Sequence, residues 1–174
     1  SAPEKAAHSH REIEFLVIGL CCSLMNNPKA ENMETTAKKV ITVKAVINAP
    51  VEKVWACWTE PRHITKWCQA SDDWHAPRAE NDLRNGGKFS TTMAARDGSV
   101  SFDFNGVYTN VEQNKMIEYI LEDGRKVIIH FTGKEKETEV VESFEAEGTN
   151  PLEMQQAGWQ SILNNFKRYT EANG

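Results

Sequence analysis

Residues 82–138 repeat one pattern, in which a short run of β-forming residues ends at a tight-turn signal. This alternation predicts an antiparallel meander, because short strands joined by Gly, Asn and Asp turns pair with their neighbours along the chain. The runs also carry large apolar side chains, so another layer must cover one face of the sheet. The turn signals are Gly86-Gly87, Asp97-Gly98, Gln113-Asn114, Asp123-Gly124 and Gly133-Lys134.

A strand and two short helices are predicted before the meander. Residues 39–48 are β-branched and alternate between apolar and polar, which is typical of a half-buried strand. Apolar residues then recur at helical spacing over residues 51–59, and a proline separates them from a second short helix over residues 62–67. We expect residues 68–77 to form a loop and residues 78–84 a short edge strand.

The C-terminal segment, residues 151–172, is the long helical pattern available to cover the meander. Asn150 is able to cap this helix, and Pro151 suits its first position. One stripe of the helix carries Leu152, Gln155, Trp159, Ile162, Phe166 and Tyr169. The order of elements predicts an α+β fold in which a curved antiparallel sheet of six to seven strands (β-α-α-β-meander-α) wraps around a long C-terminal helix.

The length of 174 residues with 40% hydrophobic content fits one domain, which we place at residues 38–174. Residues 1–37 are predicted to be an extension or leader. Their apolar run, residues 15–25, is too short to span a bilayer. It is compatible with a docked helix, a signal or anchor segment, or a leader.

Residues before Lys38 are expected to be dispensable for folding, because the strand, helices, meander and final helix are complete without them. A chain that begins near Glu34 should keep the dispersed NMR spectrum and the urea midpoint of the full chain. Aggregation or a collapsed spectrum would instead assign residues 15–25 to the core.

The charge distribution argues against two classes of partner. The formal net charge is −5, and acids and bases are interspersed instead of forming blocks. We therefore expect neither nucleic acid nor a membrane surface as a partner. The four cysteines, Cys21, Cys22, Cys57 and Cys68, form no C-x-x-C pair, which indicates free thiols in a reducing cytoplasm.

An ordered set of short motifs runs from about residue 40 to residue 169. These are Ala49-Pro50 with Val54-Trp55, Thr59-Glu60-Pro61, Trp67, Asp82-Leu83-Arg84-Asn85-Gly86-Gly87, Met93 with Asp97-Gly98, Gly106, Glu137-Thr138 and Gly158-Trp159. In this order they resemble the START-like superfamily, also called SRPBCC or helix-grip, which includes polyketide cyclases and Bet v-like proteins. Within it, the chain is most similar to the branch named for the activator of heat-shock protein 90 ATPase homologue.

The resemblance implies a sheet that grips the C-terminal helix, with an apolar cavity between them. Apolar side chains of the helix and sheet are the candidates for a ligand-binding lining, although they could also simply fill a core. The candidates are Trp67, Phe89, Met93, Phe102, Phe104, Tyr108, Tyr119, Met154, Trp159, Leu163 and Phe166.

Two ionisable residues interrupt the apolar pattern of the last strands. The alternation of its strand groups His130 with Lys126 and Thr132, which favours an outward side chain, although an inward His130 could shuttle a proton. Glu142 is in register with Val140 and Phe144 on the predicted inner face. A carboxyl there would have a raised pKa and could act as a general acid or base, whereas a place at the sheet edge would make it ordinary.

The remaining polar motifs predict neither a metal nor a cofactor. Cys68, Asp72, Asp73 and His75 do not have the ligand spacing of zinc or calcium sites. Gly86-Gly87 has no phosphate-loop lysine, and no G-x-S-x-G motif occurs. No residue is therefore assigned a catalytic role.

The sequence predicts binding of a small hydrophobic or amphipathic molecule in the cavity. One alternative is a cyclase-like or dehydratase-like enzyme, which two or more inward groups among His130, Glu142, Asp103 and Tyr119 would favour. The other is a co-regulator of a chaperone ATPase, which a contiguous exposed apolar patch would favour. Contact with a chaperone or a second copy of the chain is left open.

Overall fold

The computed structural model describes residues 38–173. It contains seven strands and three helices in the order β1 (Val40–Ile47), α2 (Val51–Thr59), α3 (Pro61–Trp67), β2 (Trp74–Asn81), β3 (Lys88–Ala95), β4 (Ser101–Glu112), β5 (Met116–Leu121), β6 (Lys126–Lys134), β7 (Glu137–Glu145) and α4 (Leu152–Ala172). The predictions for residues 1–37, including the apolar run and Cys21 and Cys22, lie outside the described residues.

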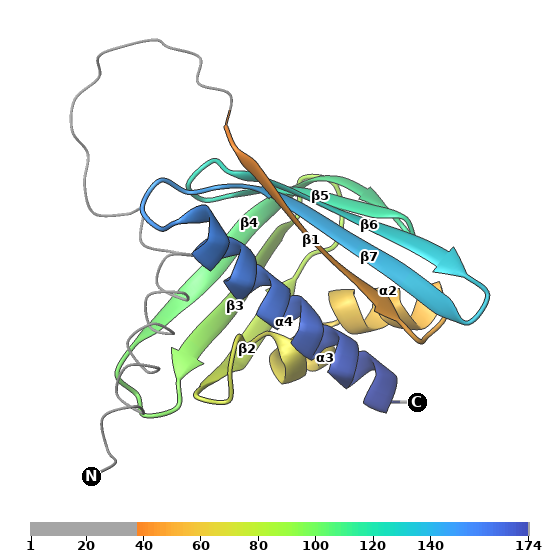
Figure 1. Ribbon diagram of the computed structural model, residues 1–174, viewed down its shortest axis with the longest axis horizontal. Coiled ribbons are helices and arrows are strands. Elements are labelled where there is room, and N and C mark those ends of the chain that lie inside the picture. The colour runs from red at the N-terminus through yellow and green to blue at the C-terminus, as the bar shows by residue number, and fades with distance from the viewer. Residues whose placement is uncertain (1–37, 174) are drawn as a thin grey trace.

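The strands form one curled antiparallel sheet in the order β1-β7-β6-β5-β4-β3-β2 (Figure 1). Strands β3 to β7 pair with their neighbours in the chain, as expected of a meander, and β1 joins β7 at one edge. The predicted α+β helix-grip fold is confirmed. Every strand of the curled sheet therefore has one face available to line a shared interior.

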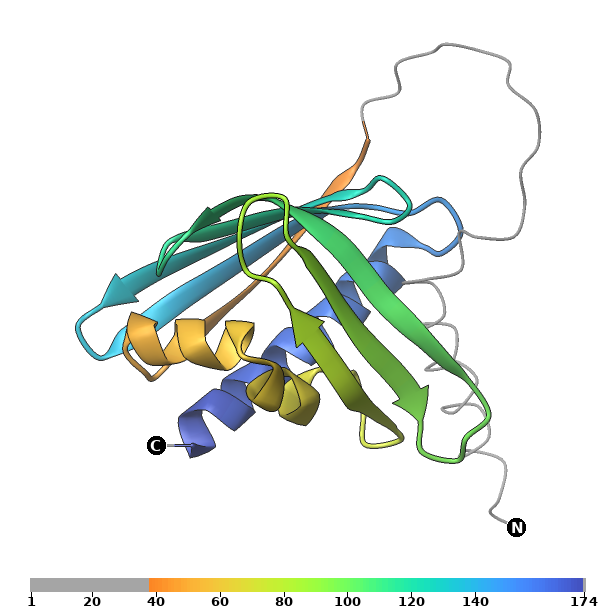
Figure 2. The same ribbon diagram turned by 180° about the vertical axis from the view of Figure 1, so that it is seen from behind.

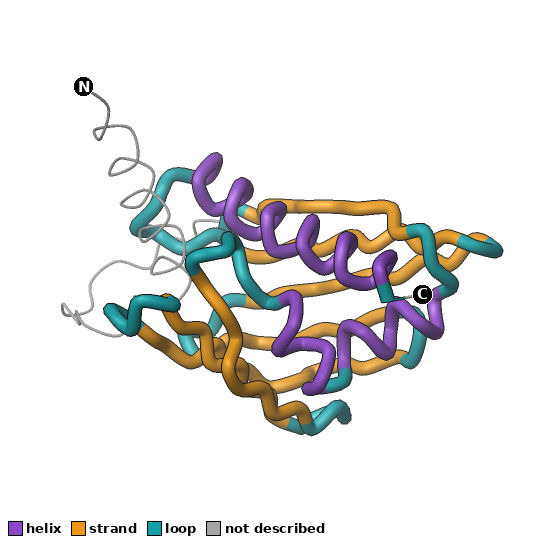
Figure 3. Tube along the Cα trace, turned by 90° about the horizontal axis from the view of Figure 1, so that it is seen from below, coloured by secondary structure: helices purple, strands orange, loops and turns teal. Residues whose placement is uncertain are grey.

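All three helices lie on the same side of the sheet (Figure 3). Seen from behind, α4 runs along the open side of the curl, and α2 and α3 close the end beside it (Figure 2). The burial pattern of α4 follows its 3.6-residue period, with Trp159, Leu163 and Phe166 buried. This arrangement encloses one interior between the sheet and three helices.

The interior divides into a large core and a small second cluster. The large core takes side chains from every helix and from most strands. The second cluster lies on β2 and β3 and consists of Trp74, Met93 and Ala95, with Phe102 packed beside them. Cys68, Phe104 and Ile162 pack against both groups.

Three local predictions were wrong in detail. The edge strand begins at Trp74 and not at residue 78, because a register shift between His75 and Arg78 accommodates Pro77 in an edge strand. Gly133 lies inside β6, where a Cβ would come within 3.0 Å of Val51. At the start of α4, Asn150 does not cap the helix; the N-cap residue is Pro151, with no side-chain hydrogen bond.

No helix within residues 38–173 is long and apolar enough to cross a membrane.

Candidate ligand cavity

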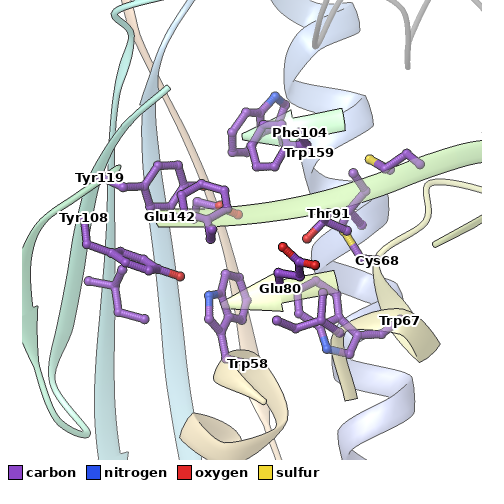
Figure 4. Close-up of a pocket in the computed structure, with 15 residues that line it drawn as sticks. Trp58, Trp67, Cys68, Glu80, Thr91, Phe104, Tyr108, Tyr119, Glu142 and Trp159 are labelled. Carbon is purple, nitrogen blue, oxygen red and sulfur yellow. The ribbon is translucent and has the colours of Figure 1, made fainter. Parts of the chain in front are cut away.

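A cavity of about 90 Å³ lies between the sheet, the two short helices and α4 (Figure 4). This is more space than a single water needs, which is about 10–15 Å³, so the cavity is of a size for a small molecule. Fifteen residues line it: Trp58, Ile64, Trp67, Cys68, Glu80, Phe89, Thr91, Met93, Phe104, Tyr108, Ile117, Tyr119, Glu142, Trp159 and Ile162.

The sheet side of the cavity is a cluster of aromatic rings. Phe89 of β3 lies 4.8 Å from Tyr119 and 5.2 Å from Tyr108, measured between ring centroids. Gly106 is opposite Phe89 in the pairing of β3 with β4, and a Cβ there would lie 2.6 Å from the Phe89 ring. A glycine at this position therefore lets the Phe89 ring fold down over β4.

The helix side of the cavity is also aromatic. Trp58 of α2 and Trp67 of α3 have ring centroids 5.1 Å apart, and both pack edge-on against Phe166 of α4. The Trp67 indole N–H donates to the Cys57 carbonyl at 2.8 Å, which fixes its ring. Trp159 stacks on Phe144 with centroids 3.9 Å apart, so it is both core and cavity wall.

A polar chain holds one wall in place. The Tyr108 hydroxyl donates to Asn81 Oδ1 at 2.7 Å, and Asn81 Nδ2 donates to the Thr59 carbonyl at 2.6 Å. This chain joins β4, β2 and the end of α2. Burial raises the pKa of Tyr108 above its usual range, so its hydroxyl stays protonated and remains a donor to Asn81.

Glu142 is the buried carboxyl of the cavity. It lies on the inner face of β7, opposite Val43 of β1 and Ile129 of β6, and only 6% of it is exposed. It accepts no hydrogen bond from residues 38–173, and burial alone raises its pKa to about 8. Of the two readings of Glu142, the inward one is therefore correct, and its carboxyl is largely protonated at neutral pH.

Two weakly acidic groups face the same space. Burial raises the pKa of the Tyr119 hydroxyl well above its usual range, and the Glu142 charge acts in the same direction. Burial likewise raises the pKa of the Cys68 thiol to about 12, again with Glu142 as the second cause. Cys68 is therefore a neutral thiol, and its reactivity as a thiolate is suppressed.

Seven of the eleven candidate lining residues surround the cavity: Trp67, Phe89, Met93, Phe104, Tyr108, Tyr119 and Trp159. The other four lie elsewhere. Phe102 packs on Trp74 in the second cluster, because the curl of the sheet carries this end of β4 away. Leu163 and Phe166 are buried in the large core without lining the cavity, and Met154 is half-buried near the start of α4.

Eight of the fifteen lining residues were not among the candidate lining residues predicted from the sequence. Trp58, Ile64 and Ile162 are on the inner faces of their helices, and the helical spacing could have found them. Thr91 shares a strand face with Phe89 and Met93, so alternation could have found it despite its polarity. Nothing in the sequence signals Cys68 or Glu80, which reach the cavity through the course of the chain after α3 and the irregular β2.

His130 and Asp103 both point away from the cavity. His130 is exposed on β6, as the alternation of that strand predicts, and Asp103 is exposed and accepts a hydrogen bond from Thr92 at 2.6 Å. Of the four groups that would favour an enzyme, Glu142 and Tyr119 face inward. Among residues 38–173, no cluster of three or more His, Cys, Asp or Glu could hold a metal ion.

Comparisons with known proteins agree with this architecture. Residues 48–171 match the family described as Activator of Hsp90 ATPase homolog 1-like protein. The AHSA1-like protein of Aeromonas hydrophila is 44% identical over 78% of this chain and 94% of its own, with a TM-score of 0.74. A Cytophaga hutchinsonii protein is 61% identical over 76% and 92%, with a TM-score of 0.67.

More distant solved structures share the fold alone. A Chromobacterium violaceum protein is 21% identical over 76% of this chain and 98% of its own, with a TM-score of 0.69. No curated protein matches the chain.

Proposed function

The chain belongs to the Activator of Hsp90 ATPase homolog 1-like family, and we propose that it binds a small amphipathic molecule in the cavity between the sheet and α4. Proteins of this fold commonly bind hydrophobic ligands. The observation that carries the proposal is a partly enclosed, mostly apolar cavity into which an unpartnered carboxyl projects. Binding sites for small molecules combine these two properties.

Benzyl alcohol is a small probe that combines one apolar ring with one hydroxyl, which matches the apolar lining and the single inward carboxyl. It is expected to shift the indole N–H resonances of Trp58, Trp67 and Trp159 together. Trp55 and Trp74 do not line the cavity, so their indole resonances should remain in place. Two-dimensional NMR at increasing benzyl alcohol concentration measures all five tryptophans at once.

A matched pair of substitutions controls for binding elsewhere. Ile162→Phe adds a ring at the cavity wall and should abolish the shifts. Ile120→Phe makes the same change on β5, where the side chain is 38% exposed, and should leave them intact. The proposal fails if saturating benzyl alcohol moves all five tryptophans equally, or if both variants respond like the parent protein.

Acid–base catalysis is a second candidate, because Glu142 and Tyr119 both face the cavity and the Glu142 charge raises the pKa of the Tyr119 hydroxyl. A carboxyl whose pKa lies near 8 is suited to accept or donate a proton at neutral pH. The test is conversion of a small β-hydroxy ketone to its enone. Catalysis would require turnover that Glu142→Gln abolishes while benzyl alcohol binding persists.

A surface role in regulating a chaperone finds less support among residues 38–173. The exposed large apolar side chains are Val40 and Val46 on β1, and Val107 and Ile120, which pair across β4 and β5. Val40 and Val46 lie near opposite ends of β1, and Val107 and Ile120 form a single cross-strand pair, so these four side chains do not make one contiguous patch. The cavity therefore remains the better candidate for function.

A further inference from the structure

The titratable side chains that line the cavity are all acids. Glu142 and Glu80 are carboxyls, and no Lys, Arg or His of residues 38–173 lines the space with them. Arg125 acts on Tyr119 but is paired with Asp123 at 2.6 Å and does not line the cavity. Glu80 is exposed at the opening and is paired with Arg78, so Glu142 is the unpaired charge site inside.

Folding removes most of the Glu142 side chain from bulk water, because only 6% of it is exposed. A buried polar group without a hydrogen-bond partner is costly, and native proteins rarely keep one unless it has a role. A ligand that pairs with Glu142 would therefore gain the interaction without a further desolvation of the neutral carboxyl, although a cation must also supply the free energy of ionising it. The group is in effect a preorganised half of an ion pair or hydrogen bond.

Seven aromatic side chains surround this carboxyl. They come from every layer of the site: Trp58, Trp67, Phe89, Phe104, Tyr108, Tyr119 and Trp159. Figure 4 shows Trp58, Tyr108 and Tyr119 grouped around the same space as Glu142. The face of an aromatic ring attracts a cation, and Trp does so most strongly. A cavity that combines aromatic rings with a carboxyl has the composition expected of a binding site for an organic cation.

From these observations, and resting on the proposed function, we propose that the ligand is a small organic cation, with one ammonium group and an apolar or aromatic body. The cavity volume of about 90 Å³ restricts the part of the ligand inside it to a small group. The ammonium group pairs with Glu142, and the body packs among the rings. An anionic ligand, such as a carboxylic acid, meets no basic partner inside and is excluded.

Pairing with an ammonium group requires Glu142 to ionise. Because the free protein holds this carboxyl protonated at neutral pH, binding of the cation transfers the Glu142 proton to solvent. No basic side chain on the described elements packed around Glu142 competes with the ligand for this carboxyl. Its neighbours in register are Val43 of β1 and Ile129 of β6. The helices present Trp58, Trp159 and Ile162 to the cavity. The titratable groups that face it are Tyr119 of β5, Tyr108 of β4, Cys68 after α3 and the exposed Glu80 of β2.

Three probes of nearly equal size separate the charges. Benzylamine is the cation, benzyl alcohol the neutral probe and benzoate the anion. Isothermal titration at pH 7 should give a dissociation constant for benzylamine about tenfold or more below that for benzyl alcohol, with no binding of benzoate. Repeating the titration in buffers of different ionisation enthalpy should show about one proton released with benzylamine and none with benzyl alcohol.

Substitutions at the two carboxyls identify which one pairs. Glu142→Gln should reduce benzylamine affinity to that of benzyl alcohol for the same variant, and should abolish proton release. Glu142→Asp keeps the charge and should restore part of the preference. Glu80→Gln removes the other carboxyl of the lining and should preserve the preference for benzylamine over benzyl alcohol, whereas loss of that preference would assign the pairing to Glu80.

The outcomes distinguish this inference from the proposed function. The inference that the ligand is a cation is wrong if benzyl alcohol binds as tightly as benzylamine, or if Glu142→Gln keeps the preference for benzylamine. In either case the proposal that the cavity binds a small molecule still stands. If benzoate binds most tightly, the charge argument is overturned. If none of the three probes shifts the resonances of Trp58, Trp67 and Trp159, both proposals fall.

Discussion

Replacement of Trp159 by alanine is expected to lower the free energy of unfolding by about 3–5 kcal/mol, the usual cost of removing a buried large aromatic side chain. Trp159 is 5% exposed, stacks on Phe144 at 3.9 Å and meets the Phe104 ring edge-on. It joins α4 to the inner face of the sheet, so its loss weakens the contact between the two main layers. The new void would also merge with the existing cavity.

Urea unfolding followed by far-ultraviolet circular dichroism measures this loss without relying on the deleted fluorophore. Trp159→Phe retains a ring to stack on Phe144 and should lose less than the alanine variant. Ile120→Ala is the surface control, because this side chain is partly exposed on β5, and it should change stability by less than about 1 kcal/mol. A Trp159→Ala loss as small as that control would contradict the packing of α4 described above.

The sheet and the long helix could be predicted because both repeat over many residues. The alternation of β1 and β7 and the 3.6-residue stripe of α4 each report one buried face, and hydrophobic burial enforces that face in the fold. Turn residues with positive φ, such as Gly98 and Gly124, mark where strands reverse. Each of these signals comes from residues close together in the chain, so each can be recognised in a single sequence.

The start of β2 could not be predicted from the same signals. Asp72, Asp73 and Pro77 are typical of a loop, yet the strand begins at Trp74. The β3 partner and the register shift beside Pro77 determine this pairing, and both depend on contacts distant in the chain. Glu80 reaches the cavity through this irregular strand, so it too was beyond prediction.

The sequence predicted the kinds of residue that line the candidate site better than it predicted which individual residues line it. Residues on one strand face, such as Phe89 and Met93, both reach the cavity because the sheet presents that face inward. Phe102 and Phe166 have the same sequence signal and do not reach it. Curvature of the sheet and the crossing of α4 decide which inward residues border a void, and neither quantity is encoded in a local pattern.

The second large effect is expected from pH at Glu142. Its folded pKa of about 8 exceeds the ordinary value of 4.5, so the folded state holds a proton that the unfolded state releases between these values. The stability that this proton represents is present below pH 4.5 and is lost as pH rises through about 8. Each pH unit in this interval costs about 1.4 kcal/mol, so the total loss approaches about 5 kcal/mol.

Glu142→Gln removes this dependence, because glutamine has a similar shape to the protonated acid and carries no charge at any pH. The difference in unfolding free energy between the two proteins isolates the one carboxyl from all other titrations. Glu142→Gln should therefore match the parent protein near pH 4.5 and exceed its stability by several kcal/mol at pH 9. Urea midpoints measured at intervals of one pH unit would follow the divergence.

Glu118→Gln provides a control of opposite sign. Glu118 on β5 accepts a hydrogen bond from Thr109 at 2.7 Å, and this bond, helped by Lys126, lowers the pKa of Glu118. Its stabilising contribution is present above the ordinary pKa and lost as pH falls, so the difference for Glu118→Gln should be constant from pH 6 to 9. A constant difference for Glu142→Gln over pH 5 to 9 would mean that Glu142 is ionised throughout, and would remove the basis for proton release on binding a cation.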